Sequence, residues 1–376
     1  MKNGLLLKKI NFICFIIIIV SLFKLNVYAQ TWIDNNITRY FENSYVWDFG
    51  FTNDALWVLS VSNDSVIPML TKYKDNSFTN YYIGVVSEGP LDDYKKAPTG
   101  KRNFYPSFLL VQNDKVWLCD RSKLIYCLVH NDSVKFLKSN YNDSEKIINS
   151  NQFIDGDGNL YTIAYYQDII NESEYKMFFS TGLDEFTEYQ FPINLDSGLT
   201  PRFLLFNDNS IFFVAEDAGT NTIIYSSENN TNDNKFLKLD NIYINNYYNN
   251  NSNIYLWCTD ITKSRPNSNI LVLDYKLNLI SKYSLRKNLG LSTCSFFVSN
   301  NKSAFISDGS GFYEYDYLSN KLTFIEEKIN KLYFGIAFRR IKIHKNIIYG
   351  CYDGLNDLFD CRLLNDFGLY LYDIGK

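Results

Sequence analysis

The stretch Asn113-Asp114-Lys115-Val116-Trp117-Leu118-Cys119 joins a polar turn to an apolar run with an aromatic residue at its centre. This combination of turn and run occurs seven times, with the runs at 55–59, 115–119, 159–163, 210–214, 253–257, 303–307 and 346–350. Their marker residues, Trp57, Trp117, Tyr161, Phe212, Tyr255, Phe305 and Tyr349, are spaced by 60, 44, 51, 43, 50 and 44 residues. Short runs of β-forming residues between Asn, Asp, Ser and Gly are typical of strands and turns. The repeat therefore indicates an all-β protein.

Each repeat contains further strand-like runs after the marker. Residues 311–316 and 368–373 share the template Gly-x-Tyr-x-Tyr-Asp, and alternating runs such as 186–189 and 280–283 follow at the fourth position. Four strands per unit at a period of roughly 40 to 50 residues is the pattern of a β-propeller blade, which buries its faces against neighbouring blades. Seven markers predict a seven-bladed β-propeller of four-stranded antiparallel blades.

Closure of the ring is predicted from the two ends of the pattern. The seventh unit stops at its third run, and residues 36–41 carry a fourth-strand pattern ahead of the first unit. We expect this N-terminal strand to pair with the C-terminal blade, because pairing removes two unpaired edges. The alternatives are a ring of six or eight blades, with one unit misjudged, and a less favoured pair of β-sandwiches.

Residues 1–29 have the pattern of a signal peptide. Lys2, Lys8 and Lys9 precede an uncharged apolar run at 10–23, which is shorter than the roughly 20 residues that span a bilayer. Val27 and Ala29 supply the small residues that a signal peptidase reads. We expect cleavage before Gln30, export to the periplasm or the outside of the cell, no stable membrane insertion, and one β-propeller domain over 30–376.

The charge of the chain disfavours nucleic acid as a partner. The full sequence has 37 basic and 41 acidic residues, and loss of residues 1–29 would leave 33 basic residues and a net charge of −8. Nucleic-acid binding needs a basic face that neutralises phosphates.

Six cysteines follow the signal region: Cys119, Cys127, Cys258, Cys294, Cys351 and Cys361. An exported protein can form disulfides, and 119/127 and 351/361 are close enough to bridge across hairpins. Buried thiols explain the same residues equally well. With no Cys-x-x-Cys and two histidines, no zinc set is predicted, and we expect no metal site or cofactor.

Asp155-Gly156-Asp157-Gly158-Asn159 has oxygen-bearing residues at alternate positions, as calcium loops have. It lacks the distal glutamate of such loops, and its residues run directly into a strand. A tight turn, in which Gly adopts positive φ and Asp bonds the backbone, is the favoured interpretation.

Candidate binding residues follow the second run of each repeat. Acidic residues stand there in six units, and the loop at 260–268 adds two cations; the set is Asp120, Asp168, Asp217, Asp260, Lys263, Arg265, Asp308 and Asp353. They would form an acidic rim on a loop-rich face, able to attract a cationic partner or hold a cation. The alternative is that each Asp bonds its own turn.

The turn and strand at 155–161, with the Gly-Leu-Tyr-x-Tyr-Asp strand at 368–373, resemble the repeats of bacterial two-component-regulator-type propellers. They are also similar to those of exported NHL and WD40-like propellers. The resemblance implies the fold and an exported binding role, and it implies no catalytic residue.

The sequence thus favours a non-enzymatic exported propeller that binds a protein or glycan partner through its loop-rich face. The alternative is a carbohydrate-active enzyme, a lyase or glycosidase, that uses two rim carboxylates.

Overall fold

The structure is a computed structural model. It describes residues 40–41, 44–62, 68–82, 106, 108–120, 125–131, 133–138, 146–167, 173–182, 186–191, 198–207, 210–217, 221–228, 235–250, 252–262, 267–285, 289, 295–299, 302–307, 312–324, 338–344, 347–352 and 369–373. Within these residues the chain forms 27 strands in seven sheets, and in each sheet the strands that follow one another in sequence pair antiparallel.

The first four sheets are consecutive four-stranded units. Sheet 1 consists of β1 (Ser44–Phe51), β2 (Leu56–Ser62), β3 (Pro68–Lys74) and β4 (Ser77–Tyr82). Sheet 2 consists of β5 (Phe108–Gln112), β6 (Lys115–Asp120), β7 (Ile125–His130) and β8 (Ser133–Lys138). Sheet 3 consists of β9 (Lys146–Ile154), β10 (Leu160–Gln167), β11 (Ser173–Ser180) and β12 (Thr187–Tyr189). Sheet 4 consists of β13 (Thr200–Asn207), β14 (Ser210–Glu216), β15 (Thr222–Glu228) and β16 (Lys235–Leu239).

The remaining sheets continue the series. Sheet 5 consists of β17 (Ile242–Asn249), β18 (Ile254–Asp260), β19 (Asn267–Leu273) and β20 (Leu279–Ser284). Sheet 6 consists of β21 (Ser295–Ser299), β22 (Ser303–Ser307), β23 (Phe312–Asp316) and β24 (Lys321–Phe324). Sheet 7 has three described strands, β25 (Phe338–His344), β26 (Ile347–Tyr352) and β27 (Leu369–Asp373).

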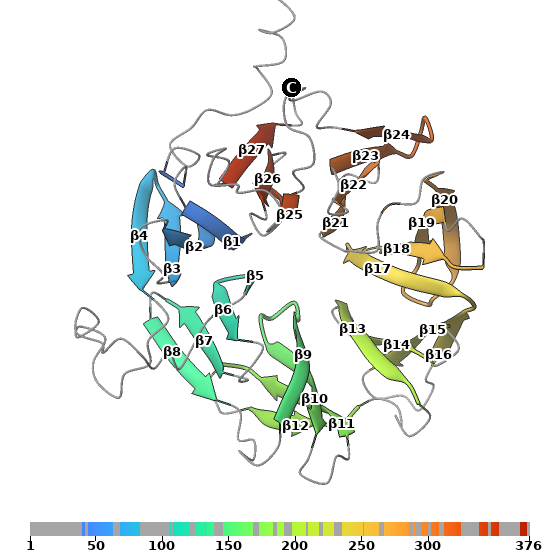
Figure 1. Cartoon of the computed structure of the whole chain (residues 1–376), viewed down its shortest axis with the longest axis horizontal. Coiled ribbons are helices and arrows are strands. Elements are labelled where there is room, and N and C mark those ends of the chain that lie inside the picture. Colours follow the sequence, from blue (N-terminus) through green and yellow to red (C-terminus); the bar gives the residue numbers. More distant parts are fainter. Residues whose placement is uncertain are drawn as a thin grey trace, which may run out of the picture.

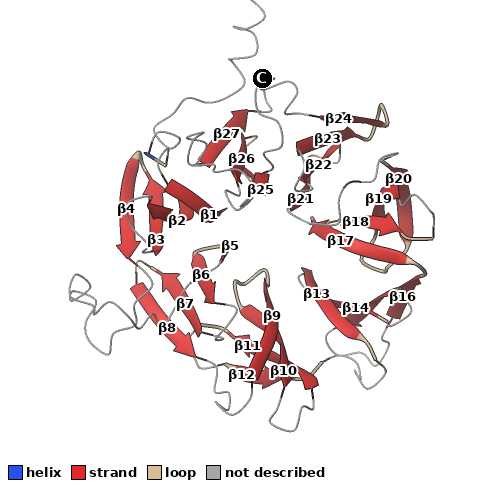
Figure 2. Ribbon diagram, in the orientation of Figure 1, coloured by secondary structure: helices blue, strands red, loops and turns tan. Residues whose placement is uncertain are grey.

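The sheets stand in chain order around a common centre, with the first strand of each sheet innermost (Figure 1). Figure 2 shows that strands account for almost all of the described secondary structure. Contacts run from each sheet to the next, and from β25 and β26 back to β1. The expectation of an all-β, β-propeller-like fold is confirmed, and all seven marker runs lie on the second strands of sheets.

The hydrophobic core lies between neighbouring sheets. Trp117 of sheet 2 is fully buried in a cluster with Leu160 and Phe178 of sheet 3, and Tyr161 of sheet 3 packs against Leu204 and other residues of sheet 4. The markers Trp57, Phe212, Tyr255 and Tyr349 likewise lie in clusters shared with the following sheet, which for Tyr349 is sheet 1. The repeated aromatic residue is therefore the residue that packs one sheet against the next.

The first and last sheets meet through aromatic and polar contacts. The ring of Phe51 stacks on that of His344 at 4.6 Å and lies 4.6 Å from the ring of Tyr349. The Lys342 ammonium donates a hydrogen bond to the Phe49 carbonyl. These contacts join residues about 290 positions apart in sequence, since Lys342 and Phe49 are separated by 293 residues.

The predicted closing strand, residues 36–41, falls mostly outside the described residues. Of its members, Tyr40 stacks on Phe78 with ring centroids 3.8 Å apart, and Phe41 is buried beside Phe49 and Tyr349. This segment therefore approaches both sheet 1 and sheet 7. Its pairing with β27 stays a prediction.

Three of the six cysteines are described with their side chains, and all three are buried thiols. Cys119 lies in the core between sheets 2 and 3, whereas Cys127 lies in the core between sheets 1 and 2. The two side chains point to opposite faces of sheet 2, so they do not form the hairpin disulfide that their spacing allows. Cys351 is described without its side chain, and Cys361 lies outside the described residues.

Candidate functional site

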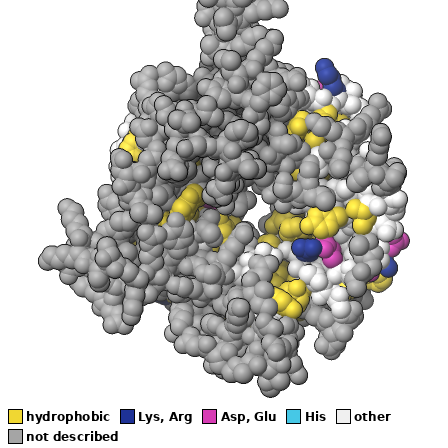
Figure 3. All heavy atoms as spheres, viewed as in Figure 1, with side chains coloured by type: hydrophobic (Ala, Val, Ile, Leu, Met, Phe, Trp, Pro, Cys, Tyr) yellow, Lys and Arg dark blue, Asp and Glu magenta, His cyan; other side chains and the backbone are white. Residues whose placement is uncertain are grey.

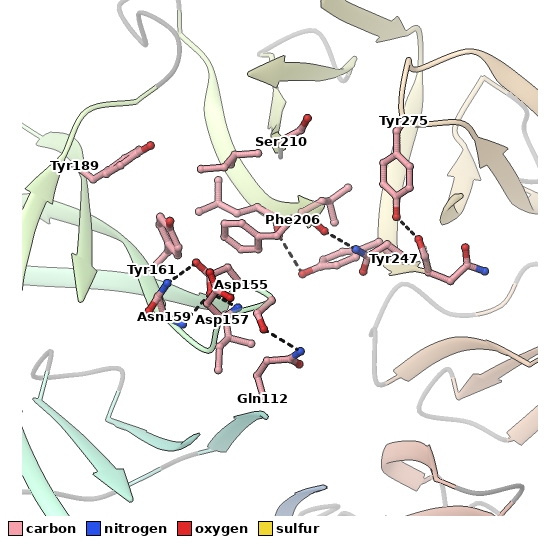
Figure 4. Close-up of a pocket in the computed structure, with 17 residues that line it drawn as sticks. Gln112, Asp155, Asp157, Asn159, Tyr161, Tyr189, Phe206, Ser210, Tyr247 and Tyr275 are labelled. Atoms are coloured by element: carbon pink, nitrogen blue, oxygen red, sulfur yellow. Dashed lines mark hydrogen bonds between the residues drawn. The ribbon is translucent and has the colours of Figure 1, made fainter. Parts of the chain in front are cut away.

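A cavity of about 820 Å³ lies where the innermost strands of sheets 2 to 5 end (Figure 4). Gln112, Ile154, Phe206 and Asn249 stand at or near the last positions of β5, β9, β13 and β17. The other lining residues are Asp155, Gly156, Asp157, Asn159, Tyr161, Tyr189, Leu204, Leu205, Ser210, Ile211, Tyr247, Asn250 and Tyr275. Its volume is within the range of about 300–1,000 Å³ that small-molecule sites occupy.

The turn at 155–159 forms one wall of the cavity. The Asp155 Oδ1 atom accepts hydrogen bonds from the backbone N–H of Asp157 (3.0 Å) and of Asn159 (2.8 Å). Its Oδ2 atom accepts one from Asn159 Nδ2 at 2.9 Å. The carboxylate of Asp155 is thus used within the turn, as the turn interpretation of this motif predicts.

Sheet 2 holds this turn in place. The carbonyl oxygens of Gly156 and Gly158 accept hydrogen bonds from Asn113 Nδ2 (2.7 Å) and Trp117 Nε1 (3.0 Å). Gly158 has φ +75°, and a Cβ atom there would lie 3.0 Å from the Lys115 Cδ atom. A side chain at Gly158 would therefore strain the backbone and press on sheet 2.

The Asp155–Asn159 arrangement recurs elsewhere in the molecule. Asp217 and Asn221 in sheet 4, and Asp274 and Asn278 in sheet 5, repeat the pair of hydrogen bonds from backbone N–H and side-chain amide to carboxylate, at 2.8–2.9 Å. The pKa of the Asp274 carboxyl is below its usual range, because hydrogen bonds from Asn278 and Lys276 outweigh a desolvation that acts in the opposite direction. Many Asp and Asn residues of this chain therefore stabilise hairpins.

Aromatic rings form a second wall. The Tyr161 ring lies 4.8 Å from that of Phe206 and 5.8 Å from that of Tyr189, in an edge-to-face arrangement with the latter. Burial raises the pKa of the Tyr161 phenol, and the nearby Asp155 and Asp157 carboxylates raise it further. Figure 4 shows Tyr161 and Phe206 beside the turn that carries the two aspartates. The cavity thus combines ring faces with carboxylate oxygen at one end.

The opposite wall is built from sheet 5. Tyr247 donates a hydrogen bond from its hydroxyl to the Leu204 carbonyl (3.2 Å), and Asn249 Nδ2 donates one to the Phe206 carbonyl (2.7 Å). Tyr275 bonds the Asn250 carbonyl. The bonds of Tyr247 and Asn249 fix sheet 5 against sheet 4, and the Oδ1 atom of the Asn249 side chain is left as an acceptor on the wall.

The predicted rim lies at the other end of the strands. Asp217 directly follows β14, and Asp260 is the last residue of β18. The cavity lies at the starts of these two strands, about 20 Å away along the strand direction. Asp260 Oδ1 accepts hydrogen bonds from the backbone N–H and the hydroxyl of Thr262. Both described rim carboxylates are therefore bonded within their turns.

The other six rim residues have no described side chain. Asp120 ends β6, and its side chain is not described. Asp168, Lys263, Arg265, Asp308 and Asp353 lie outside the described residues. Their role stays a prediction.

The sequence patterns predict the turns that line the cavity, but they do not predict the cavity itself. Tyr189, Ser210 and Asn249 are separated in sequence and belong to three different sheets. The available signal was the Asn- and Asp-rich turn before each second strand, which indicated a hairpin and carried no sign of a common cavity.

Two features are absent from the described residues. No group of three or more His, Cys, Asp or Glu side chains could hold a metal ion in this part of the chain. The described residues also include no helix with the length and apolar character needed to cross a membrane.

In Figure 3 hydrophobic side chains lie near the centre around which the sheets stand, and a basic side chain lies beside an acidic one in the same region.

No family model matches the chain, and no curated protein matches it in sequence. Solved structures do match its fold. A prolyl endopeptidase matches with TM-score 0.54 and 11% identity over 88% of this chain, which spans 50% of the endopeptidase chain. Raptor of Chaetomium thermophilum matches with TM-score 0.51 and 12% identity, over 94% of this chain and 30% of that one. The polysaccharide lyase Uly1 has TM-score 0.48 and 9% identity, over 87% and 89% of the two chains. At these identities the likeness concerns the fold alone.

Proposed function

We propose that this protein is an exported, non-enzymatic β-propeller that binds a glycan in the cavity between sheets 2 and 5. The observation that carries the proposal is the composition of the cavity wall, which combines tyrosine rings with amide, hydroxyl and carboxylate groups. Aromatic faces pack on the apolar faces of sugar rings, while an amide both donates to and accepts from sugar hydroxyls.

Groups that face the cavity remain available for a ligand. The Ser210 and Tyr189 hydroxyls make no hydrogen bond to any described residue, and 36% of the Tyr189 side chain is exposed. Several of the lining residues belong to paired strands or to turns that are hydrogen-bonded to a neighbouring sheet, which limits the ordering that binding requires. The rim at the opposite end of the sheets is a second candidate binding surface, and we expect a protein partner to bind at that rim.

The enzyme alternative needs two carboxylates that face one another across about 5–10 Å. Among the described residues that line the cavity, the acids are Asp155 and Asp157, which belong to a single turn, and the first is bonded within it. This arrangement favours binding over glycosidic cleavage.

We also propose that the ring has seven blades and that residues 36–41 supply the fourth strand of sheet 7. Sheet 7 has three described strands, and Phe41 packs against Tyr349 of that sheet. Cysteines introduced as Thr38→Cys and Leu371→Cys would form a disulfide on oxidation if this pairing exists. Failure to cross-link in the folded protein would count against it.

The function is tested by binding of the mature chain, from Gln30, to a panel of oligosaccharides measured by calorimetry. We expect Tyr189→Ala to weaken binding about tenfold or more. Phe236→Ala is the matched control, because Phe236 is an exposed ring on β16 that does not line the cavity. Binding that survives Tyr189→Ala unchanged, or release of shortened products, would refute the proposal.

A further inference from the structure

The charge of the cavity indicates which glycans it accepts. Its described lining residues include Asp155 and Asp157 and no lysine, arginine or histidine. Asp155 accepts three hydrogen bonds in its turn, whereas the exposed Asp157 carboxylate accepts none from any described residue. One negative charge is therefore available to a ligand.

The ring faces lie close to that charge. Tyr161 is flanked by Phe206 and Tyr189, and the two aspartates lie near enough to raise the pKa of its phenol. A cation that sits over an aromatic face is attracted by the ring, and a carboxylate beside it adds to the attraction. An uncharged sugar would leave the Asp157 carboxylate with water, and a uronic acid would be repelled by it.

A lysine beside the turn is already engaged. Lys115 donates hydrogen bonds to Asn159 Oδ1 (3.3 Å) and to the Thr181 carbonyl (3.2 Å), and it is not among the lining residues. Its position on the sheet 2 side of the turn leaves the cavity side of Asp157 without a paired cation among the described residues.

We infer that the cavity selects a glycan that carries a free amino group, a 2-amino-2-deoxy sugar in its ammonium form. This inference rests on the proposed glycan binding and adds the ligand class. The ammonium lies between the Asp157 carboxylate and the rings of Tyr161, Tyr189 and Phe206, and the amide and hydroxyl groups of the wall bind the sugar hydroxyls.

The test compares two tetrasaccharides of the same backbone, one of glucosamine and one of N-acetylglucosamine, with a uronic acid tetramer as the anionic probe. By calorimetry at pH 6 and low salt, the glucosamine tetramer should bind the mature chain about tenfold more tightly than the N-acetylated one. Asp157→Asn should remove this preference, because it weakens binding of the glucosamine tetramer more than binding of the N-acetylated tetramer. The preference should also shrink at high salt, because an exposed ion pair is screened.

Asp240→Asn is the matched control, since Asp240 is an exposed acid after β16 that does not line the cavity. It should keep the full preference for the glucosamine tetramer. Equal affinity for the two tetramers, or tighter binding of the uronic acid tetramer, would overturn the inference while glycan binding stood. A chain that binds none of the three would overturn both the inference and the proposed function.

Discussion

Asp48 joins three sheets, and its substitution is the most direct test of how sheets 1, 2 and 7 are held together. The residue lies on β1, directly after a β-bulge, and 3% of it is exposed. Its Oδ1 atom accepts the Phe49 N–H (2.9 Å), and its Oδ2 atom accepts the Leu109 N–H of sheet 2 (3.1 Å). The Lys342 ammonium of sheet 7 lies 3.8 Å from Oδ1.

We expect Asp48→Asn to lower the free energy of unfolding by about 3 kcal/mol. An asparagine can accept one of the two backbone hydrogen bonds, and its NH₂ group then faces the other N–H. A buried donor is left unpaired, which costs about 1–3 kcal/mol, and the hydrogen bond that remains is weaker because its acceptor no longer carries a charge. The half-exposed contact with Lys342 adds little to this sum.

The assay is urea unfolding of the mature chain, followed by tryptophan fluorescence. With a slope of about 3 kcal/mol/M, the midpoint should fall by roughly 1 M. Asp54→Asn serves as the control, because Asp54 is an exposed acid on the same sheet, paired with Lys74, and its loss should cost less than about 1 kcal/mol. Equal shifts for the two variants would refute the assignment of Asp48 as a buried link between sheets.

Three further outcomes are expected. Gly158→Ala should lower stability by about 1–2 kcal/mol, because φ is +75° and the new Cβ would press on Lys115, whereas Gly156→Ala meets no atom within 4 Å and should be nearly neutral in urea unfolding. Burial raises the pKa of Cys258 to about 12, so this thiol ionises at lower pH in the unfolded chain than in the folded one. The free energy of unfolding should therefore fall as pH rises from about 9 toward 12, by about 1 kcal/mol at pH 10, and the urea midpoint of Cys258→Ala should fall less steeply with pH than that of the unsubstituted chain. Asp260→Asn should leave glycan affinity within about twofold in calorimetry, because the residue lies at the far end of β18 from the cavity; a larger loss would move the binding site to the rim.

The strands and their order could be predicted from the sequence because both depend on local pattern. The run around Trp117 is continuously apolar from Val116 to Cys119, and a polar turn precedes it, so its position as a buried strand follows from residues within a few places. The motif at 155–159 was likewise readable, since an Asp bonding its own turn needs only residues up to Asn159.

The sequence by itself therefore determined the strands, the turns and the repeated aromatic residue of this protein. The tertiary structure alone decided which thiols share a face and which side chains from different sheets meet. Tyr189, Ser210 and Asn249 form one cavity because sheets 3, 4 and 5 pack side by side, and Asp48 meets Lys342 because the last sheet contacts the first. These contacts depend on how whole sheets pack, and no local pattern carries that information.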